Sequence, residues 1–148
     1  MQLQDKTFLV TGAASGLGAA TAERLVAGGA KVVLCDLSET IEAHASRLGE
    51  CAVACRGDVT DPEAMQAAVD RAVGLGGLHG VVHCAGVVSV EQLLDKEGNP
   101  ATLESFTRTV NVNLIGTFNV LRLAASAMID NSPMNEDGER GVIIDTVS

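Results

Sequence analysis

Residues 11–18 read Thr-Gly-Ala-Ala-Ser-Gly-Leu-Gly. An apolar run precedes this stretch and the Ala- and Leu-rich run 17–27 follows it, so the order predicts a strand, a glycine-rich turn and a helix. We expect Gly12 to allow a sharp turn, Gly16 to let a phosphate approach the backbone, and Gly18 to let the helix pack against the strand. The free N–H groups at the start of the helix then face an anion, most simply a dinucleotide pyrophosphate.

An acidic residue after the next apolar run supports a dinucleotide site. The glycine spacing, Gly-x-x-x-Gly-x-Gly, differs from the general fingerprint, so the turn alone is also compatible with a tight turn that binds nothing. The second expected strand, 31–35, ends at Asp36, about 20 residues beyond the glycine turn. This carboxylate can accept both hydroxyls of an adenosine ribose, or it can cap a helix. Neither the glycine turn nor Leu37-Ser38 carries an Arg or Lys for a 2′-phosphate, which favours NAD over NADP.

Strand-like and helix-like segments alternate along the whole chain. The further expected strands are 7–10, 51–55, 78–83 and 141–147, and the expected helices are 17–27, 41–48, 60–74 and 102–128. Residues 87–101, which include a glycine and a proline, are expected to form a loop or a partly helical excursion. The alternation predicts a single α/β domain of Rossmann type over residues 1–148, with a doubly wound parallel sheet of strand order 3-2-1-4-5.

Two expected helices have further sequence signals. Thr60 and Glu63 fit a capping box, with Pro62 in the first turn of the helix. From 110 to 128 the apolar residues cover more than one side of the helix, which predicts two packing partners, the sheet and another subunit.

Composition and charge limit the classes of partner. The net charge of −9 and the lack of a basic block argue against nucleic acid and anionic membranes. No apolar stretch approaches the roughly 20 residues that span a bilayer. The first residues lack the features of a secretory signal, so we expect a cytoplasmic location, with an organelle matrix as the alternative.

The cysteines and histidines predict no metal site. Cys51 and Cys55 are four residues apart, but no histidine or second cysteine pair completes a zinc site. All four cysteines, which also include Cys35 and Cys84, are expected to be buried, reduced thiols. His79 and His83 flank an apolar run, and we expect them to be structural.

Several motifs occur in the order found in one enzyme family. They are the glycine turn 11–18, Asp36, Asp58-Val59, Cys-Ala-Gly at 84–86, Asn-Val-Asn-Leu-Ile-Gly at 111–116 and Gly-Val-Ile-Ile-Asp-Thr-Val-Ser at 141–148. The chain therefore resembles the short-chain dehydrogenases/reductases over nearly its whole length. Residues 113–123 and 140–144 are similar to the type II 3-hydroxyacyl-CoA dehydrogenase branch of that family.

The resemblance implies an NAD cofactor and a role for each matching residue. Asn113 would hold a water molecule in a proton relay, and Ser148 would donate a hydrogen bond to the substrate oxygen. From the residues alone, Asn113 is also compatible with an asparagine that bonds nearby backbone. The implied cofactor-binding residues are Gly12, Ser15, Gly16 and Leu17 at the pyrophosphate with Gly18 packed behind them, Asp36 at the ribose, Asp58 and Val59 at the adenine, and Cys84, Ala85 and Gly86 beside the nicotinamide.

The chain departs from the family in three ways. Cys84 and Asp145 stand where asparagine is common, and the sequence contains no tyrosine, whereas family members continue to a Tyr-x-x-x-Lys pair that exchanges the substrate proton. We therefore expect a fragment of a longer protein, with a natural remnant as the alternative. The complete protein would be a homotetrameric, NAD-dependent oxidoreductase that interconverts a secondary alcohol and a ketone, such as a 3-hydroxyacyl-CoA and a 3-ketoacyl-CoA. The alternative function is a dinucleotide-binding module without catalysis.

Residues 1–148 expressed alone should have no dehydrogenase activity with NAD, because no tyrosine is present to exchange the proton, a contribution of about 10²–10⁴-fold in rate. The same polypeptide should be poorly soluble, because its last expected strand and one side of the helix 110–128 lack partners. Expression followed by size-exclusion chromatography and an NADH assay checks both expectations. A soluble monomer that oxidises a 3-hydroxyacyl-CoA would contradict them.

Overall fold

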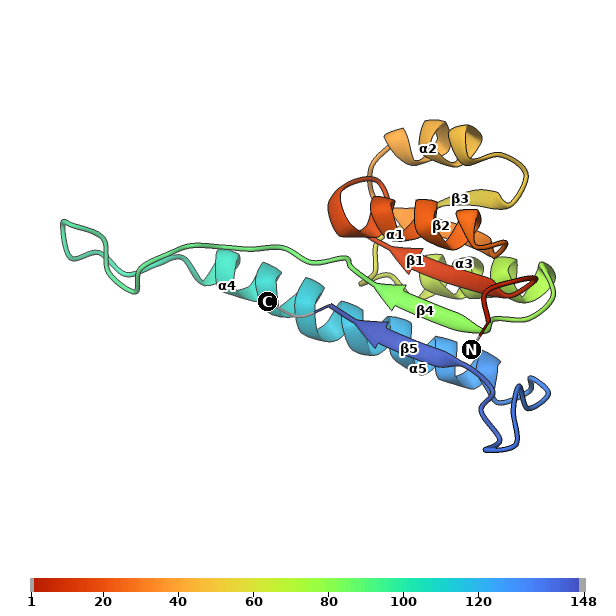
Figure 1. Cartoon of the computed structure of the whole chain (residues 1–148). Helices are drawn as coiled ribbons and strands as arrows, with labels where there is room; N and C mark the ends of the chain where they lie inside the picture. The colour runs from red at the N-terminus through yellow and green to blue at the C-terminus, as the bar shows by residue number, and fades with distance from the viewer. Residues whose placement is uncertain (1, 147–148) are drawn as a thin grey trace.

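A computed structural model describes residues 2–146 and contains one parallel sheet with strand order β3-β2-β1-β4-β5. The strands are β1 (Thr7–Thr11), β2 (Lys31–Asp36), β3 (Ala52–Arg56), β4 (Gly80–His83) and β5 (Val142–Asp145). The helices are α1 (Gly16–Ala27), α2 (Thr40–Leu48), α3 (Pro62–Gly74), α4 (Leu103–Val110), the π-helical turn η1 (Asn111–Gly116) and α5 (Thr117–Met128). Figure 1 shows the strands running in the same direction, so the predicted fold class and strand order are confirmed.

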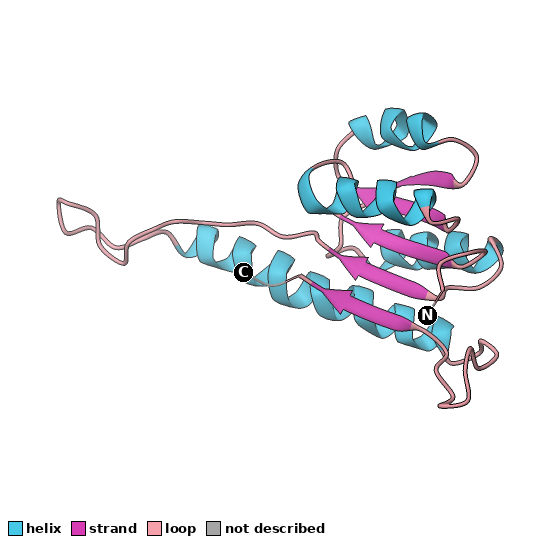
Figure 2. Ribbon diagram, viewed as in Figure 1, coloured by secondary structure: helices cyan, strands magenta, loops and turns pink. Residues whose placement is uncertain are grey.

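Helices cover both faces of the sheet because alternate strand residues point to opposite sides (Figure 2). On β1, Leu9 packs into a core formed with α3 and α5, whereas Phe8 and Val10 pack into a second core formed with α1 and α2. The central strand is therefore buried on both faces, as its continuous apolar run predicts. This packing fixes the carboxyl ends of β1, β2 and β4 next to one another at one edge of the sheet.

The fourth and fifth strands are shorter than expected. Within the stretch 78–83 the strand is observed over Gly80–His83. Just before it, the backbone N–H of Thr7 donates to the ring Nδ1 of His79 at 3.1 Å. His79 therefore has a structural role, as predicted. The expected strand 141–147 is observed over Val142–Asp145, and Val147 lies outside the described residues.

The expected capping box of α3 is wrong by one residue. Asp61 is the N-cap, and its carboxylate accepts from the backbone N–H groups of Glu63 and Ala64 at 2.9 and 3.3 Å. Thr60 donates its hydroxyl to Asp58 instead, because the side chain of Asp58 closes a tight turn with Thr60. Pro62 then occupies the first helical turn, where its missing N–H costs nothing.

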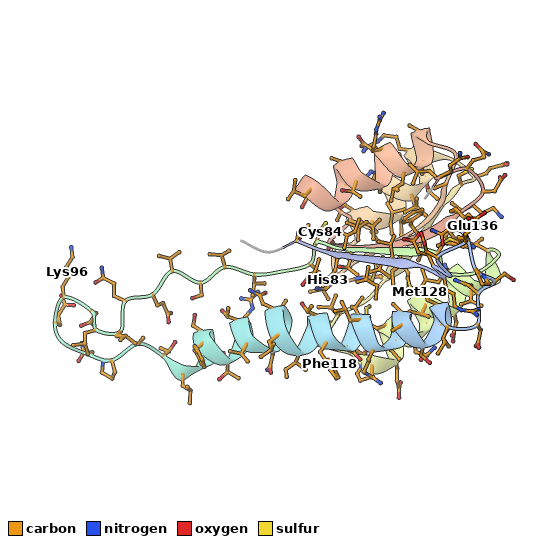
Figure 3. All side chains as sticks on the ribbon, turned by 60° about the horizontal axis from the view of Figure 1, so that its bottom comes forward. His83, Cys84, Lys96, Phe118, Met128 and Glu136 are labelled. Carbon is orange, nitrogen blue, oxygen red and sulfur yellow. The ribbon has the colours of Figure 1, made fainter. Side chains whose placement is uncertain are left out.

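The long helical segment expected at 102–128 contains a π-helical turn that the sequence did not predict. α4, η1 and α5 follow one another without a break, and η1 inserts a wider turn between them. Val120, Ala124 and Met128 of α5 are buried against the sheet, whereas Phe118 remains 66% exposed and lies on the opposite side of the helix (Figure 3). The expected two-sided apolar helix is thus observed.

The loop between β4 and α4 extends far from the sheet, with Lys96 near its tip (Figures 1 and 3). Asp95 orders this tip, since its carboxylate accepts from the backbone N–H groups of Glu97 and Asn99 and from the Asn99 amide. These hydrogen bonds lower the pKa of the Asp95 carboxyl. The tip is therefore a structured turn on a long arm of the chain.

The expectation that all four cysteines are buried is wrong. Cys35 is buried, Cys55 and Cys84 are half-buried, and Cys51 is exposed, because β3 begins after it. All four are free thiols. Between residues 2 and 146, no cluster of three or more His, Cys, Asp or Glu side chains has an arrangement suited to a metal ion. Over the same residues, the helices are too short or too polar to span a bilayer.

Candidate functional site

A cleft of about 1050 Å³ lies at the carboxyl ends of the central strands. Open α/β sheets bind their ligands at this edge, where the strand order reverses between β1 and β4. The cleft brings together every residue that was expected to bind a cofactor. These lining residues are Gly12, Ser15, Gly16, Leu17, Gly18, Asp36, Asp58, Val59, Cys84, Ala85 and Gly86.

The three glycines of the turn after β1 differ in their surroundings: two make close backbone approaches and the third faces open space. Gly12 has a φ of +65°, and a Cβ atom there would lie 2.8 Å from the Ala85 nitrogen. A Cβ atom on Gly18 would collide with the backbone of Gly12. At Gly16, with a φ of +54°, a Cβ atom would meet nothing within 4 Å, so this residue faces open space. The turn is therefore packed tightly on the protein side and open toward the cleft.

The start of α1 presents backbone donors to this space. α1 begins at Gly16, with Ser15 as an extended N-cap residue. Among the described residues, the Ser15 side chain makes no capping hydrogen bond, so it does not occupy the first backbone N–H groups of α1. Leu17 is 71% exposed beside the same opening. An uncapped helix N-terminus next to an open glycine suits an anionic ligand.

Asp36 is held at the end of β2 by two backbone donors. Its Oδ2 accepts from the N–H of Ala14 at 3.0 Å, and its Oδ1 accepts from the N–H of Ser38 at 2.9 Å. The alternative role as a helix cap is excluded, because α2 starts at Thr40 with Glu39 as its N-cap. The carboxylate is thus fixed between the glycine turn and β2, facing the cleft.

A basic side chain near Asp36 is already paired. Arg56 at the end of β3 donates its Nε to the Leu37 carbonyl at 3.1 Å, and it forms an ion pair with Glu39 at 2.9 Å. Its guanidinium is absent from the cleft wall formed by the described residues. The charged side chain that lines the cleft at the end of β2 is therefore the carboxylate of Asp36.

The Asp58-Val59 segment is packed under α5. The Val59 carbonyl accepts from the buried Asn119 amide at 2.9 Å. A Cβ atom on Gly116 would lie 2.6 Å from the Val59 side chain, so this glycine lets the helix approach. Helix α5 thus fixes one wall of the cleft as well as covering the sheet.

The 84–86 segment forms the wall next to β1. The N–H of Cys84 donates to the Thr11 carbonyl at 3.2 Å, and the N–H of Ala85 donates to the Thr11 hydroxyl at 3.2 Å. Partial burial raises the pKa of the Cys84 thiol, so this side chain is neutral near pH 7. The wall is therefore formed by backbone and an uncharged thiol.

The two expected catalytic residues have different outcomes. Asn113 lies in η1 beside the cleft, and its side chain holds the backbone of Val87 through both polar atoms: Oδ1 accepts from N–H at 2.9 Å, and Nδ2 donates to the carbonyl at 2.8 Å. These bonds reach across to the β4–α4 loop, 26 residues away in sequence, so Asn113 does not simply bond its own turn. Ser148 lies outside the described residues.

Part of the cleft wall was not predicted from the sequence. α4 contributes residues that no motif marked, whereas η1 contributes Asn111 and Val112 from the motif at 111–116, to which no cofactor contact was assigned. Cys35, at the end of β2, reaches the cleft because β2 ends at the sheet edge. The additional lining residues include Cys35, Leu37, Gly57, Thr60, Val87, Leu103, Glu104, Thr107, Arg108, Asn111 and Val112.

Comparison with known proteins identifies the class of this site. Residues 6–148 match the family described as short chain dehydrogenase, so the chain belongs to the short-chain dehydrogenase family. Over 95% of its length it is 47% identical to the 3-hydroxyacyl-CoA dehydrogenase type-2 of Homo sapiens, covering 54% of that protein. The protein of the same name from Drosophila melanogaster is 44% identical, over 99% of this chain and 58% of that one.

A solved structure gives the same result in three dimensions. The crystal structure of 3-hydroxyacyl-CoA dehydrogenase type-2 from Mycobacterium avium superposes with a TM-score of 0.93 at 36% identity, over 100% of this chain and 59% of that one. The chain spans about half the length of the curated relatives it matches.

Membership of this family implies a nicotinamide dinucleotide cofactor, and the described residues fit one. The open space at Gly16 lies where a pyrophosphate would approach backbone N–H groups, and the fixed carboxylate of Asp36 lies one strand away. A cleft of about 1050 Å³ is also large enough for a ligand of this size.

Gly12→Ala in the full-length protein should weaken NADH binding by about 5- to 150-fold, equivalent to about 1–3 kcal/mol of backbone strain. The added Cβ would meet the Ala85 nitrogen at a positive φ, so the turn must move away from β4. The matched control is Gly74→Ala, where a Cβ meets nothing within 4 Å at the end of α3. Fluorescence titration, with circular dichroism to verify folding, checks this; equal binding by both variants would contradict it.

Proposed function

We propose that this chain is the cofactor-binding part of an NAD-dependent oxidoreductase that interconverts a secondary alcohol and a ketone. The observation that carries the proposal is the convergence on one cleft of the glycine turn, Asp36, Asp58-Val59 and the 84–86 wall. The names of the similar proteins favour a 3-hydroxyacyl-CoA and its 3-ketoacyl-CoA as the substrate pair. Residues 1–148 then form its NAD-binding Rossmann domain.

Each part of the cleft has a proposed task. The cofactor, when bound, supplies the hydride acceptor or donor. The N–H groups at the start of α1 bind the pyrophosphate, with Gly12, Ser15, Gly16 and Leu17 around it, and Gly18 keeps the turn compact. Asp36 accepts the ribose hydroxyls, while Asp58 and Val59 contact the adenine. The backbone of Cys84, Ala85 and Gly86 orients the nicotinamide end.

The proton chemistry is shared between this chain and residues outside the printed sequence. Asn113 helps to hold a water molecule in the proton relay, and Ser148 donates a hydrogen bond to the substrate oxygen. The group that exchanges the substrate proton would come from a tyrosine beyond residue 148, since the printed sequence has none. Such a group contributes about 10²–10⁴-fold to the rate.

The proposed enzyme is a homotetramer. Leu114, Ile115 and Phe118 form an exposed apolar strip on η1 and α5, and each is more than half exposed. Apolar strips of this kind are covered by protein contacts in oligomers. The net charge of −9 and the compact α/β fold suit a cytoplasmic or organelle-matrix enzyme that binds neither nucleic acid nor a membrane.

The alternative function is a dinucleotide-binding module without turnover. One observation favours it, namely the absence of tyrosine from the 148 residues of the sequence. Both functions use the same cleft, so cofactor binding does not separate them. Turnover of a 3-hydroxyacyl-CoA by the full-length protein does.

The full-length protein should bind NAD more tightly than NADP, because a 2′-phosphate would meet the Asp36 carboxylate. A lost charge-assisted hydrogen-bond pair costs about 1.5–3 kcal/mol, or about 10- to 150-fold in affinity. Asp36→Asn should bring the two affinities closer together, whereas Asp70→Asn, which removes an exposed carboxylate of α3 outside the cleft, should leave their ratio unchanged. Isothermal titration calorimetry measures both. Equal affinity of the unmodified protein for NAD and NADP would exclude this role for Asp36.

Asn113→Ala should lower kcat for 3-hydroxyacyl-CoA oxidation by about 100-fold while NAD affinity changes little, because its proposed task is in the proton relay. Asn99→Ala removes the hydrogen bond that the Asn99 side-chain amide donates to Asp95 at the tip of the β4–α4 loop, so it controls for general loosening of that loop. Steady-state kinetics and NAD titration of both variants check this. Normal turnover of Asn113→Ala would leave Asn113 with a structural role only.

A further inference from the structure

His83 is a buried polar residue directly before the 84–86 wall of the cleft, and the proposed mechanism does not use it. It ends β4, is 1% exposed, and lies next to Cys84 (Figure 3). Both ring nitrogens are hydrogen-bonded to hydroxyl groups: Nδ1 to Thr11 at 2.7 Å and Nε2 to Thr117 at 2.9 Å. The imidazole therefore bridges the end of β1 and the start of α5.

The direction of each hydrogen bond follows from the partners. The Thr117 hydroxyl donates its single hydrogen to the Asn113 carbonyl at 2.8 Å, because a carbonyl oxygen can only accept. Thr117 must then accept from His83, which places the ring proton on Nε2. In a neutral ring Nδ1 is the acceptor, so the Thr11 hydroxyl donates to it and itself accepts the N–H of Ala85 at 3.2 Å.

One tautomer thus satisfies the whole chain of bonds. It runs from Ala85 N–H to the Thr11 hydroxyl and on to His83 Nδ1, and from His83 Nε2–H to the Thr117 hydroxyl and on to the Asn113 carbonyl. If Nδ1 carried the proton, the Thr11 hydroxyl oxygen would accept from both His83 and Ala85. The hydroxyl hydrogen of Thr11, which is buried, would then lose Nδ1 as its acceptor. Burial also lowers the pKa of His83, against a smaller opposing effect of Asp145, and so favours the neutral ring.

The hydrogen-bonded series ends at Ala85 on one side and at Asn113 on the other, and both residues are next to the proposed reaction centre. Ala85 lies in the cleft wall. Asn113 holds the backbone of Val87, which is two residues after Ala85 in the sequence. The segment 85–87 is therefore linked to Asn113 directly at Val87 and through His83 at Ala85. Such a closed ring of hydrogen bonds restricts the rotation of η1 relative to β4.

We propose that His83, in its neutral Nε2–H form, is a positioning residue that sets the Asn113 carbonyl and the η1 turn relative to the Ala85–Val87 backbone through Thr11 and Thr117. The catalytic meaning of this positioning rests on the proposed function of Asn113. The hydrogen-bond geometry itself does not, and the two are tested separately.

The tautomer is measured first, in the full-length protein labelled with ¹⁵N-histidine. Long-range proton–nitrogen NMR spectra should show His83 with a protonated Nε2 and a bare Nδ1 near pH 7. A protonated Nδ1, whether in the other neutral tautomer or in a charged ring, would overturn the proposal. This measurement needs no turnover, so it stands even if the protein proves not to be a dehydrogenase.

The positioning role is measured with variants of Thr117, which avoid the folding risk of replacing a buried histidine. Thr117→Val should speed hydrogen exchange at the Val87 amide and lower kcat by about 5- to 100-fold, with the Kd for NAD changed by less than about twofold. Thr117→Ser, which keeps the hydroxyl, should restore both.

Thr109→Val is the matched control, because Thr109 also donates its hydroxyl to the carbonyl four residues earlier, that of Ser105, but has no bond to His83. It should leave Val87 exchange and kcat unchanged. If Thr117→Val and Thr109→Val behave alike, His83 does not position Asn113. If the unmodified full-length protein has no turnover, the proposed function fails, and Val87 exchange alone decides whether the His83 linkage exists.

Discussion

The contact of the β1 turn with the end of β4 is the constraint on which the rest of the site depends. Gly12 lies so close to Cys84 and Ala85 that a single Cβ would separate them, and Gly18 lies even closer to Gly12. Because β1 and β4 are neighbours where the strand order reverses, this backbone contact joins the glycine turn and the 84–86 wall into one cleft. The cores on both sides of β1 then keep the two strand ends from sliding apart.

Features set by short stretches of sequence were predictable, and features set by distant partners were not. The strands and helices and the cleft-lining role of Asp36 follow from apolar periodicity and from one carboxylate after a strand, which are local signals. The strand order follows from their alternation together with the rules for parallel crossovers. The capping box was misplaced by one residue because Asp58 competes for Thr60. The bridge from Thr11 through His83 to Thr117 joins residues 72 and 34 positions apart, so only the folded chain reveals it.

The π-helical turn shows why local reasoning stops at this site. Residues 102–128 read as one long helix, and nothing in their periodicity marks the insertion at η1. The wider turn occurs where Asn113 reaches the β4–α4 loop, where Gly116 packs on Val59, and where Thr117 bonds His83. Each of these contacts depends on tertiary structure. Turns of this kind are frequent at functional sites because they re-aim side chains within an otherwise regular helix.

The proposed dinucleotide site must attract an anion although the protein is acidic and its cleft has little positive charge. The chain carries a net charge of −9, and Arg108 is the basic side chain among the residues that line the cleft in the described part of the chain. The oxygens of Asp36 and Asp58 already accept backbone N–H groups, which offsets part of their repulsion of an anion. In the proposed function, attraction for a pyrophosphate therefore comes mainly from the backbone N–H groups at the start of α1, which are fixed in place by the fold. These donors act over the first helical turn only, so they select a ligand by its position rather than by long-range charge. Their position depends in turn on the tight packing of Gly12 against Ala85 and of Gly18 against Gly12.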